Sequence, residues 1–381
     1  MHTPSESPAL LNIKDWFEIE NIEELDTPAL LVYPDRVRDN IRRAVLLAGG
    51  PDRLRPHMKT SKCSHVCQML LDEGIRKFKC ATIAEAELVA MCGAPDVLLA
   101  YQPVGPKVER LMQLIQQYPA TQFSCLVDHP VPAKAIAAAA QRLALHLPVF
   151  VDINPGMNRT GILPGIEALD LYRLCHKQKG IEPIGFHVYD GHLTQPDMEQ
   201  RQRSCDAAFA PVEEMGQQLQ AEGLPMPQLI AGGTPTFLVH AQYNDRECSP
   251  GTFVYWDAGY GKLFPEMPFI PAALVATRVV SQCSDTQLTI DLGHKAVASE
   301  SDMAHRVHFL NAPDAELVKH SEEHGVIQLP AGHGIQIGDV LFGLPHHICP
   351  TVSLYDRAAV IEQGRVTASW ATGARNRSIN I

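Results

Sequence analysis

The first feature with a chemical meaning is a lysine that closes a short apolar and basic run. Residues 54–60 read Leu-Arg-Pro-His-Met-Lys-Thr, and the lysine is Lys59. A lysine amine can bond to an aldehyde cofactor once it has lost its proton, and partial burial and nearby positive charge favour that neutral form. Arg55 and His57 could supply the charge. Lys59 is therefore a candidate to hold an aldehyde cofactor, although a lysine at the end of a strand is more often simply solvated. Lys62, three residues on, should lie in the following helix.

A second feature is the pair His347 and Cys349. One position separates them on a predicted strand, so their side chains should project from the same face. An imidazole with a thiolate suits zinc best among the common divalent metals, and two protein ligands leave room for water and substrate in an open catalytic site. The same pattern fits a core cysteine beside a surface histidine. The neighbouring His346 also leaves the identity of the histidine ligand open.

These residues need a scaffold, and the chain alternates short β-branched or aromatic runs with longer amphipathic segments. Such alternation is typical of repeated βα units. A first helix is expected near residues 34–47, and the longest helix from about 195 to 222. Strand candidates lie at 54–59, 77–82, 97–101, 123–128, 148–154, 184–189, 228–232 and 252–257. We therefore predict a (β/α)8 TIM-type barrel of the usual size of about 250 residues.

From about residue 269 the pattern changes to short alternating strands. Candidates lie at 274–280, 287–292, 307–309, 325–329 and 358–361. We predict a barrel domain over residues 26–265 and a smaller C-terminal β domain over residues 266–381, which carries the proposed metal ligands. Residues 1–25 are expected to pack on it. No long linker separates the two parts, so they should pack tightly.

Polar residues gather where the barrel strands end, which is where the chemistry of such barrels lies. Gly232 and Gly233 would let a loop approach a phosphate closely, and Thr234 adds a hydroxyl donor. The loops after the seventh and eighth strands are the common phosphate site of these barrels. The same residues also fit a plain tight turn. No G-x-G-x-x-G pattern follows a strand, which argues against a dinucleotide.

The composition argues against several classes of partner. The formal net charge is -11, which disfavours nucleic acid and anionic membrane surfaces. The first residues lack the basic start and apolar run of a secretory signal, and no apolar stretch approaches membrane-spanning length. The ten cysteines are spread through predicted helices and strands, as reduced core residues are. We expect a soluble cytoplasmic enzyme with a small-molecule substrate.

Five motifs follow one another in a recognisable order. They are Arg-Pro-His-Met-Lys-Thr at 55–60, the stretch 152–161 with Gly156 and Arg159, Tyr-Asp-Gly-His at 189–192, Gly-Gly-Thr at 232–234 and His-Ile-Cys-Pro-Thr at 347–351. In this order they resemble the D-threonine aldolase and D-serine dehydratase group of the alanine-racemase-like, fold-type III pyridoxal phosphate enzymes. The resemblance spans nearly the whole chain, from Asp26 to the closing strands.

The resemblance implies a cofactor site. Lys59 would form the Schiff base with pyridoxal 5'-phosphate, and Arg159 would face the pyridine nitrogen. A permanently charged guanidinium there makes the ring a weaker electron sink, so that further help is required. The implied cofactor-binding residues are His57, Lys59, Arg159, Tyr189, Gly232, Gly233, Thr234 and Tyr255.

The resemblance also bears on the acid or base and on the metal. His192 is the candidate that handles the proton of the substrate hydroxyl, although relatives often carry a histidine where this chain has Thr194 and Gln195. Relatives with aspartate in place of Cys349 lean towards manganese or magnesium. Zinc is therefore favoured at His347 and Cys349, with manganese or magnesium as alternatives.

The activity implied is that of a pyridoxal phosphate- and divalent-metal-dependent lyase acting on small D-3-hydroxy amino acids. Retro-aldol cleavage of the D-threonine aldolase type, to glycine and an aldehyde, is our first expectation. A D-serine dehydratase, which forms a keto acid and ammonia, is the alternative, followed by an amino-acid racemase and by a non-catalytic cofactor-binding protein. The metal pair argues against a racemase and the β domain against a carrier. Analogy with relatives also predicts a homodimer.

Overall fold

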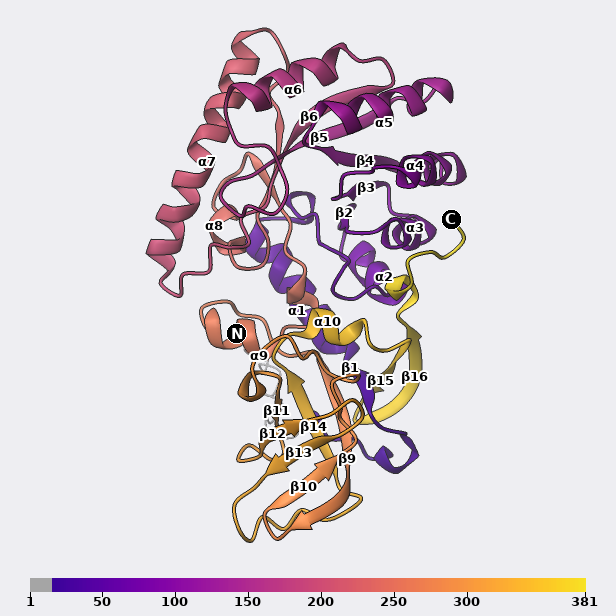
Figure 1. Cartoon of the computed structure of the whole chain (residues 1–381), viewed down its shortest axis with the longest axis vertical. Helices are drawn as coiled ribbons and strands as arrows, with labels where there is room; N and C mark the ends of the chain where they lie inside the picture. The colour runs from indigo at the N-terminus through magenta and orange to yellow at the C-terminus, as the bar shows by residue number, and fades with distance from the viewer. Residues whose placement is uncertain (1–15) are drawn as a thin grey trace, which may run out of the picture.

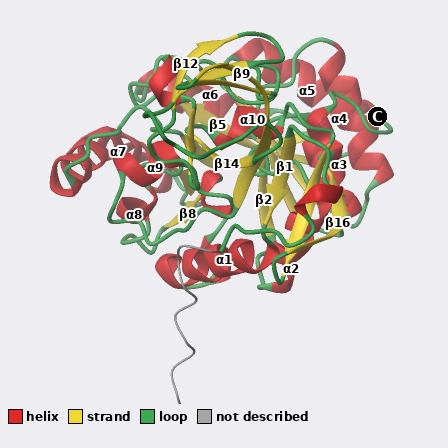
Figure 2. Ribbon diagram, turned by 90° about the horizontal axis from the view of Figure 1, so that it is seen from below, coloured by secondary structure: helices red, strands yellow, loops and turns green. Residues whose placement is uncertain are grey.

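The computed structural model describes residues 16–381, which form an α/β body and a β body joined at a narrower waist (Figure 1). The α/β body is built on seven parallel strands in sequential order, β2 (Lys77–Cys80), β3 (Asp96–Leu99), β4 (Gln122–Val127), β5 (Leu147–Ile153), β6 (Ile181–Val188), β7 (Gln228–Ala231) and β8 (Arg246–Cys248). The connecting helices are α2 (Ser64–Asp72), α3 (Ile83–Met91), α4 (Pro106–Gln117), α5 (Pro130–Arg142), α6 (Ile166–Lys177), α7 (Met198–Ala221) and α8 (Phe237–His240). A view turned by 90° shows helices around the outside of the strands (Figure 2).

The segment 54–58 closes this sheet on itself. Leu54 forms a parallel bridge with Cys248 of β8, and His57 forms one with Lys79 of β2. The prediction of a full strand over 54–59 was wrong, because these are isolated bridges. Pro56 has no amide hydrogen, so it interrupts the ladder while its carbonyl still accepts a hydrogen bond from the Lys79 amide. Seven strands and one irregular segment therefore replace the eight strands that we expected.

The predicted strand at 252–257 was also wrong. Residues Thr252–Val254 form a short 3-10 helix, and the last barrel strand lies earlier, at β8. The amides of Gly251 and Thr252 both donate to the hydroxyl oxygen of Thr234, and this turns the chain away from the sheet. Strand β8 escaped prediction because Arg246 and Glu247 are charged, although ion pairs hold both of them: Arg246 pairs with Glu213, and Glu247 with Arg55.

The barrel interior has three layers. At the bottom the Arg55 guanidinium is buried between Asp96 and Glu247, with contacts of 2.6 and 2.7 Å. The middle layer is apolar and consists of Leu98, Leu126, Phe150 and Ile230. The top layer is polar, and it contains Lys79, Asp152, His187 and Ser249, all of them buried. Ionisable groups are therefore confined to the mouth and the base, which is where a barrel with a packed middle can hold them.

The β body is a nine-stranded mixed sheet. Its main path runs β12 (Glu316–His320), β13 (Gly325–Gln328), β10 (Gln287–Ile290), β9 (Ala273–Ser284), β1 (Ala29–Val32), β15 (Arg357–Glu362) and β16 (Arg365–Ala371). Strand β14 (Val340–Pro345) pairs with β9 and with β11 (Val307–Phe309). Five of these strands lie at or near predicted positions, whereas β1, β12, β14 and β16 were not predicted. The fold class, a barrel followed by a β domain, is confirmed in this form.

Strand β1 corrects the expected start of the barrel domain. It lies within the range 26–265 but pairs with β9 and β15, so it belongs to the sheet of the β body. The next element, α1 (Pro34–Ala48), matches the predicted first helix and leads into the barrel. Phe17 and Ile19, which lie in the range 1–25 expected to pack on the β body, belong to one buried cluster with Phe342 of β14. Residues 1–15 lie outside the described part of the chain.

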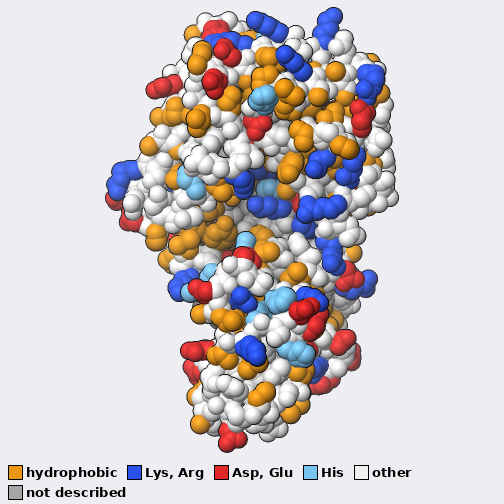
Figure 3. Space-filling view, in the orientation of Figure 1, with side chains coloured by type: hydrophobic (Ala, Val, Ile, Leu, Met, Phe, Trp, Pro, Cys, Tyr) orange, Lys and Arg blue, Asp and Glu red, His pale blue; other side chains and the backbone are white. Residues whose placement is uncertain are grey.

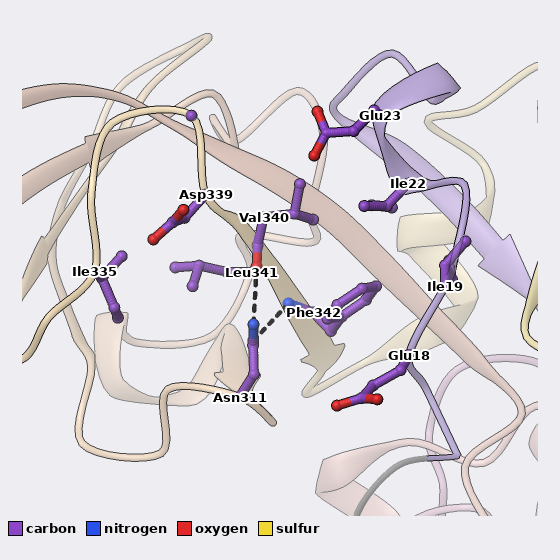
Figure 4. A pocket seen from close by; sticks show the side chains of 11 residues that line it. Glu18, Ile19, Ile22, Glu23, Asn311, Ile335, Asp339, Val340, Leu341 and Phe342 are labelled. Atoms are coloured by element: carbon purple, nitrogen blue, oxygen red, sulfur yellow. Dashed lines mark hydrogen bonds between the residues drawn. The ribbon is translucent and has the colours of Figure 1, made fainter.

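The two bodies meet around two short helices. Helix α9 (Ala258–Leu263) follows the barrel, and α10 (Ile348–Val352) lies between the barrel and the β sheet (Figure 1). A separate hollow of about 370 Å³ lies between the segment Glu18–Glu23 and the beginning of β14, where Asn311 forms hydrogen bonds with the backbone of Val340 and Phe342 (Figure 4). Among the described residues no helix has both the length and the apolar character that crossing a membrane requires.

Candidate active site

Lys59 lies at the mouth of the barrel, directly after the closing segment. Its amine is 5.9 Å from the centre of the Tyr189 ring, and the Lys79 amine and Arg159 guanidinium lie 5.4 and 4.8 Å from the same ring. In the described part of the chain none of these three cations forms an ion pair with a carboxylate. Basic and histidine side chains gather at the waist in the space-filling view (Figure 3). The mouth is therefore electropositive in a protein whose net charge is -11.

The glycine loop lies beside this ring, at the end of β7. Gly232 has φ +64°, and a Cβ atom there would lie 2.5 Å from the Thr236 hydroxyl oxygen, so only glycine fits. A Cβ atom on Gly233 would lie 2.8 Å from the Tyr189 ring. The Thr234 hydroxyl oxygen accepts the amides of Gly251 and Thr252, each at 3.2 Å. Its own hydrogen is consequently left to donate to another acceptor.

A buried network ties the glycine loop to the loop that carries Tyr189 and His192. The carboxylate of Asp190 accepts from the Thr236 hydroxyl at 2.6 Å and from His240 Nε2 at 2.7 Å. Burial alone would raise the pKa of Asp190, but His240 and these hydrogen bonds hold it below its usual value. Together with Cys205, Asp190 and His240 form a group whose potential ligand atoms lie close enough together to bind one metal ion. Because His240 Nδ1 contacts the Arg246 guanidinium, we regard this group as a structural anchor.

A second buried pair lies in the top layer of the barrel. His187 Nδ1 is 2.7 Å from Asp152 Oδ1, and the other carboxylate oxygen of Asp152 accepts from Gln102. Burial, followed by the Lys79 charge, lowers the pKa of His187. Within the described residues the buried Nε2 of His187 has no hydrogen-bond partner. An orphaned buried nitrogen of this kind is what a molecule bound in the mouth, or an ordered water, would satisfy.

His347 and Cys349 meet the barrel next to Lys59. The prediction that they lie on a strand was wrong: His347 caps the N-terminus of α10, and Cys349 lies in the first turn. The helix N-terminus still brings the two side chains together, because the Cys349 thiol and the His347 imidazole interact. The Cys349 sulfur is 3.2 Å from the Thr60 hydroxyl and 3.5 Å from that of Thr252. A residue of the β body therefore contacts the neighbour of Lys59.

The surroundings of this pair suit a metal ion. Burial raises the pKa of the Cys349 thiol, but the hydrogen bond and charge of His347 outweigh it, so that the pKa lies below its usual value. His347 Nδ1 is 2.6 Å from a carboxylate oxygen of Glu300, the kind of contact that orients a metal-binding imidazole. Asp257 fixes the loop, because its carboxylate accepts the Ile348 amide at 3.0 Å.

The structure also separates His346 from His347. The His346 ring lies 5.2 Å from the ring of His305 and 6.1 Å from that of His308, measured between centroids. His347 faces Cys349 and Glu300 instead. His347 is therefore the better placed of the two to share a metal ion with Cys349.

Three other predicted site residues have fewer contacts with the groups described above. His57 is half-buried, and its Nδ1 accepts the Lys59 amide at 3.3 Å. His192 is exposed at the mouth, with its ring against Gly156. Tyr255 is buried in the core, where Cys63 is its titratable neighbour, and the described contacts include no hydrogen bond from its hydroxyl to the glycine loop. Its predicted part in cofactor binding stays a prediction.

Several residues at the mouth were missed in the sequence. No role was predicted for Lys79, His187 or Tyr260. Lys79 and His187 lie in the top layer of the barrel. Burial raises the pKa of the Tyr260 hydroxyl, and the nearby Tyr189 and Cys349 raise it further. A signal for Lys79 existed. It stands between Phe78 and Cys80, whose side chains belong to the outer core, so strand alternation points Lys79 into the barrel.

The residues at the mouth fit an aldehyde cofactor that carries a phosphate. Lys59 supplies the amine, and the glycine loop with the Thr234 hydroxyl supplies a place for a phosphate without a Cβ atom in the way. The three unpaired cations around Tyr189 match an anionic ligand, and the orphaned His187 nitrogen matches a polar one.

Comparison with known proteins agrees with this geometry. Residues 32–258 match the alanine racemase N-terminal domain, and residues 272–361 match the putative serine dehydratase domain. A 3-hydroxy-D-aspartate aldolase from Paracoccus denitrificans is 28% identical over 93% of this chain and 93% of its own length. A D-threo-3-hydroxyaspartate dehydratase from Delftia is 25% identical over 86% of this chain and 92% of its own. The crystal structure of D-threonine aldolase from Filomicrobium marinum superimposes with a TM-score of 0.85 at 26% identity, covering 92% of this chain and 95% of that one.

Proposed function

The chain belongs to the family of the alanine racemase N-terminal domain, and we propose that it is a pyridoxal phosphate- and metal-dependent lyase acting on D-3-hydroxy amino acids. Aldolases and dehydratases of such amino acids are its relatives over nearly the whole chain. One observation carries the proposal beyond the family: the Cys349 thiol of the metal pair lies 3.2 Å from the hydroxyl of Thr60, the residue after Lys59. A metal ion held there would share one site with the cofactor amine.

The cofactor-binding roles that we propose follow from the contacts at the mouth. Lys59 would hold the aldehyde covalently, with His57 packed below it, while Gly232, Gly233 and Thr234 would bind the phosphate. Arg159 and Tyr189 would contact the ring. Pyridoxal phosphate supplies an electron sink for cleavage of a bond at the substrate Cα.

The metal and the acid or base would act at the other end of the substrate. His347 and Cys349 would bind a divalent metal, with zinc favoured by the thiol and manganese or magnesium as alternatives, and such an ion lowers the pKa of a bound hydroxyl. His192, exposed beside Gly156, would accept the hydroxyl proton. Its exposure lets it exchange that proton with water between turnovers.

We propose aldol cleavage to glycine and an aldehyde as the main reaction. The support is the relatedness to aldolases of D-threonine and 3-hydroxy-D-aspartate. The second candidate is dehydration, to a keto acid and ammonia, which requires Lys59 to take the Cα proton. It is favoured by the match of residues 272–361 to the putative serine dehydratase domain, the part that contains the metal pair.

Identification of products tests the proposal. The protein is incubated with D-threonine, D-serine and 3-hydroxy-D-aspartate, and with the L-isomers, in the presence and absence of a chelator. We expect glycine and an aldehyde from the D-isomers alone, and loss of turnover with chelator. Lys59→Ala should lose the visible absorbance of bound cofactor and roughly 10³-fold or more in rate, whereas Lys62→Ala should keep the absorbance. Turnover of the L-isomers only, or a cofactor tag on another lysine after borohydride reduction, would contradict it.

Two broader expectations remain proposals. We propose a homodimer, in which a second copy covers the mouth at the waist, and sedimentation equilibrium of the active protein tests it. We also propose that the protein works in the cytoplasm. All ten cysteines are free thiols in the structure, which supports a reducing compartment. The proposed domain division becomes a barrel domain ending near residue 265 and a β domain of residues 266–381 together with β1.

A further inference from the structure

Lys79 is a buried amine that the proposed reaction does not use. It is the last residue but one of β2, with only 3% of its surface exposed. Its backbone joins the closing segment, since its amide donates to the Pro56 carbonyl and its carbonyl accepts the Met58 amide. The side chain therefore points into the top layer of the barrel, below Lys59.

The side-chain contacts of Lys79 lead to the glycine loop. Its amine donates to the Ser249 hydroxyl at 2.9 Å. The Ser249 hydroxyl in turn donates to the Gly232 carbonyl at 2.8 Å. One hydroxyl group thus separates the Lys79 charge from the backbone of the proposed phosphate loop. The Asp190 and Thr236 network holds the same loop from the opposite side.

Among residues 16–381 the charge of Lys79 has no fixed counterion. Burial, followed by the nearby Lys59 charge, lowers its pKa to about 7, and Asp152 and Asp190 oppose that shift while Arg159 adds to it. No carboxylate of residues 16–381 lies within ion-pair distance of its amine. A buried cation without an anionic partner is destabilising unless a ligand supplies the missing charge.

We infer that Lys79 is a positioning residue for the phosphate of the cofactor: through Ser249 it fixes the Gly232 carbonyl, and its ammonium offsets the charge of a phosphate monoester bound at Gly233 and Thr234. The inference rests on the proposed function, because it assigns the phosphate to that site. It goes beyond it by giving the phosphate a buried cation from β2, the strand that the closing segment joins to β8.

The test separates the phosphate from the rest of the cofactor. Apoprotein is titrated with pyridoxal phosphate, with pyridoxal, which lacks the phosphate, and with inorganic phosphate. The variants are Lys79→Met, which keeps the length but removes the charge, Ser249→Ala, which removes the link, and Lys107→Met, the same change at an exposed lysine of α4. Thermal melting of each apoprotein shows that it is folded.

We expect Lys79→Met to weaken the binding of pyridoxal phosphate and of inorganic phosphate about tenfold or more, and that of pyridoxal less than about twofold. Ser249→Ala should weaken phosphate binding less, and the double variant should be no weaker than Lys79→Met alone, because both changes break one chain of contacts. Lys107→Met should bind as the wild type does.

Two results would overturn the inference. One is unchanged affinity of Lys79→Met for pyridoxal phosphate. The other is an equal loss for pyridoxal phosphate and pyridoxal, which would mean that Lys79 acts on the amine end. Failure of the proposed function looks different: the wild type would then bind inorganic phosphate but form no visible chromophore with pyridoxal phosphate, and the phosphate titrations alone would decide the role of Lys79. If Lys79→Met does not fold, the loss of phosphate affinity in Ser249→Ala decides it.

Discussion

Cys349 shows how one side chain can join two domains chemically. It belongs to the β body by sequence, yet its sulfur contacts the hydroxyls of Thr60 and Thr252, both of which belong to the barrel. His347 lowers the pKa of the Cys349 thiol and so favours the thiolate that a metal ion would bind. The reactive part of the site therefore depends on side chains whose positions are set by the way the two bodies pack.

Replacing this cysteine should remove metal and activity together. Cys349→Ala deletes one of two proposed protein ligands, so metal affinity should fall by more than the roughly 10–100-fold that follows loss of an outer partner such as Glu300. Cys349→Asp should retain a metal but shift its preference towards manganese or magnesium. Metal content after dialysis and the rate with added metals are the measurements. Cys283→Ala, at an exposed cysteine, is the matched control. Full metal content and full rate in Cys349→Ala would contradict the assignment.

Which site residues could be predicted from the sequence depends on how local their signal is. Lys59, the glycine loop and the His347 and Cys349 pair are short patterns that carry their meaning in adjacent positions. Lys79 and His187 carry none by themselves, because each is one polar residue in a strand, and its importance appears only when the barrel closes. Tyr255 shows the reverse: the resemblance assigned it to the cofactor site within the eighth predicted strand, but the residue follows a 3-10 turn at 252–254 and its side chain is buried in the core.

Among the helices and strands, the long amphipathic helices and the apolar strands were predictable, since their periodicity lies in the side chains. The closing segment and β8 were not. Pro56 prevents a regular ladder, and the charged pair Arg246 and Glu247 reads as a surface loop although both residues are held by ion pairs. Strand β1 was missed for another reason: its partners β9 and β15 lie more than two hundred residues away in the chain, a pairing that local pattern does not report.

The loops after β6 and β7 are joined by one buried carboxylate, and this makes their coupling testable. Asp190→Asn keeps the shape but places an amide where two donors, Thr236 and His240, need an acceptor. Loss of hydrogen bonds to a buried charge should cost about 2–3 kcal/mol of stability. It should also weaken pyridoxal phosphate binding, because the glycine loop loses its outer support. Melting temperature and cofactor titration measure both effects.

The control for this variant is Asp206→Asn. Asp206 lies on α7, where its carboxylate accepts from the exposed Tyr243 hydroxyl, so the same change should leave stability within about 0.5 kcal/mol. If Asp190→Asn melts and binds cofactor as the wild type does, the two loops are held by other contacts and the network has no such role.

Segments from both ends of the described chain cross the waist and connect the α/β body with the β body. Strand β1 near the N-terminus completes the β sheet before α1 enters the barrel, and the C-terminal residues return to the barrel helices (Figure 1). There the Glu87 carboxylate accepts the Asn380 amide at 3.2 Å, and Arg110 donates to the Ile381 carbonyl at 2.6 Å. Because both bodies are tied in this way, a change deep in the barrel should be felt in the stability of the whole protein.

Lys79 is such a residue deep in the barrel, and it should make the free energy of unfolding depend on pH. Burial and the nearby Lys59 lower its pKa from 10.5 to about 7 in the folded protein. Between these values the unfolded chain holds the proton and the folded apoprotein does not, so the free energy of unfolding should rise with pH across this window. Below about pH 7 both forms are protonated, and the folded protein bears the full penalty of a buried ammonium. Lys79→Met removes the penalty at every pH.

The variant should therefore be more stable than wild-type apoprotein at pH 6.5, by an amount on the order of a few kcal/mol, and this advantage should shrink as the pH approaches 10. Melting temperatures of both apoproteins across the range measure it, with Lys107→Met as a control that follows the wild type throughout. An advantage that stays constant with pH would show that the methionine acts by packing, and that the pKa of the Lys79 amine is the same in the folded and the unfolded protein. Since bound phosphate would supply the missing anion, saturating inorganic phosphate should raise the wild-type melting temperature more than that of Lys79→Met at pH 6.5.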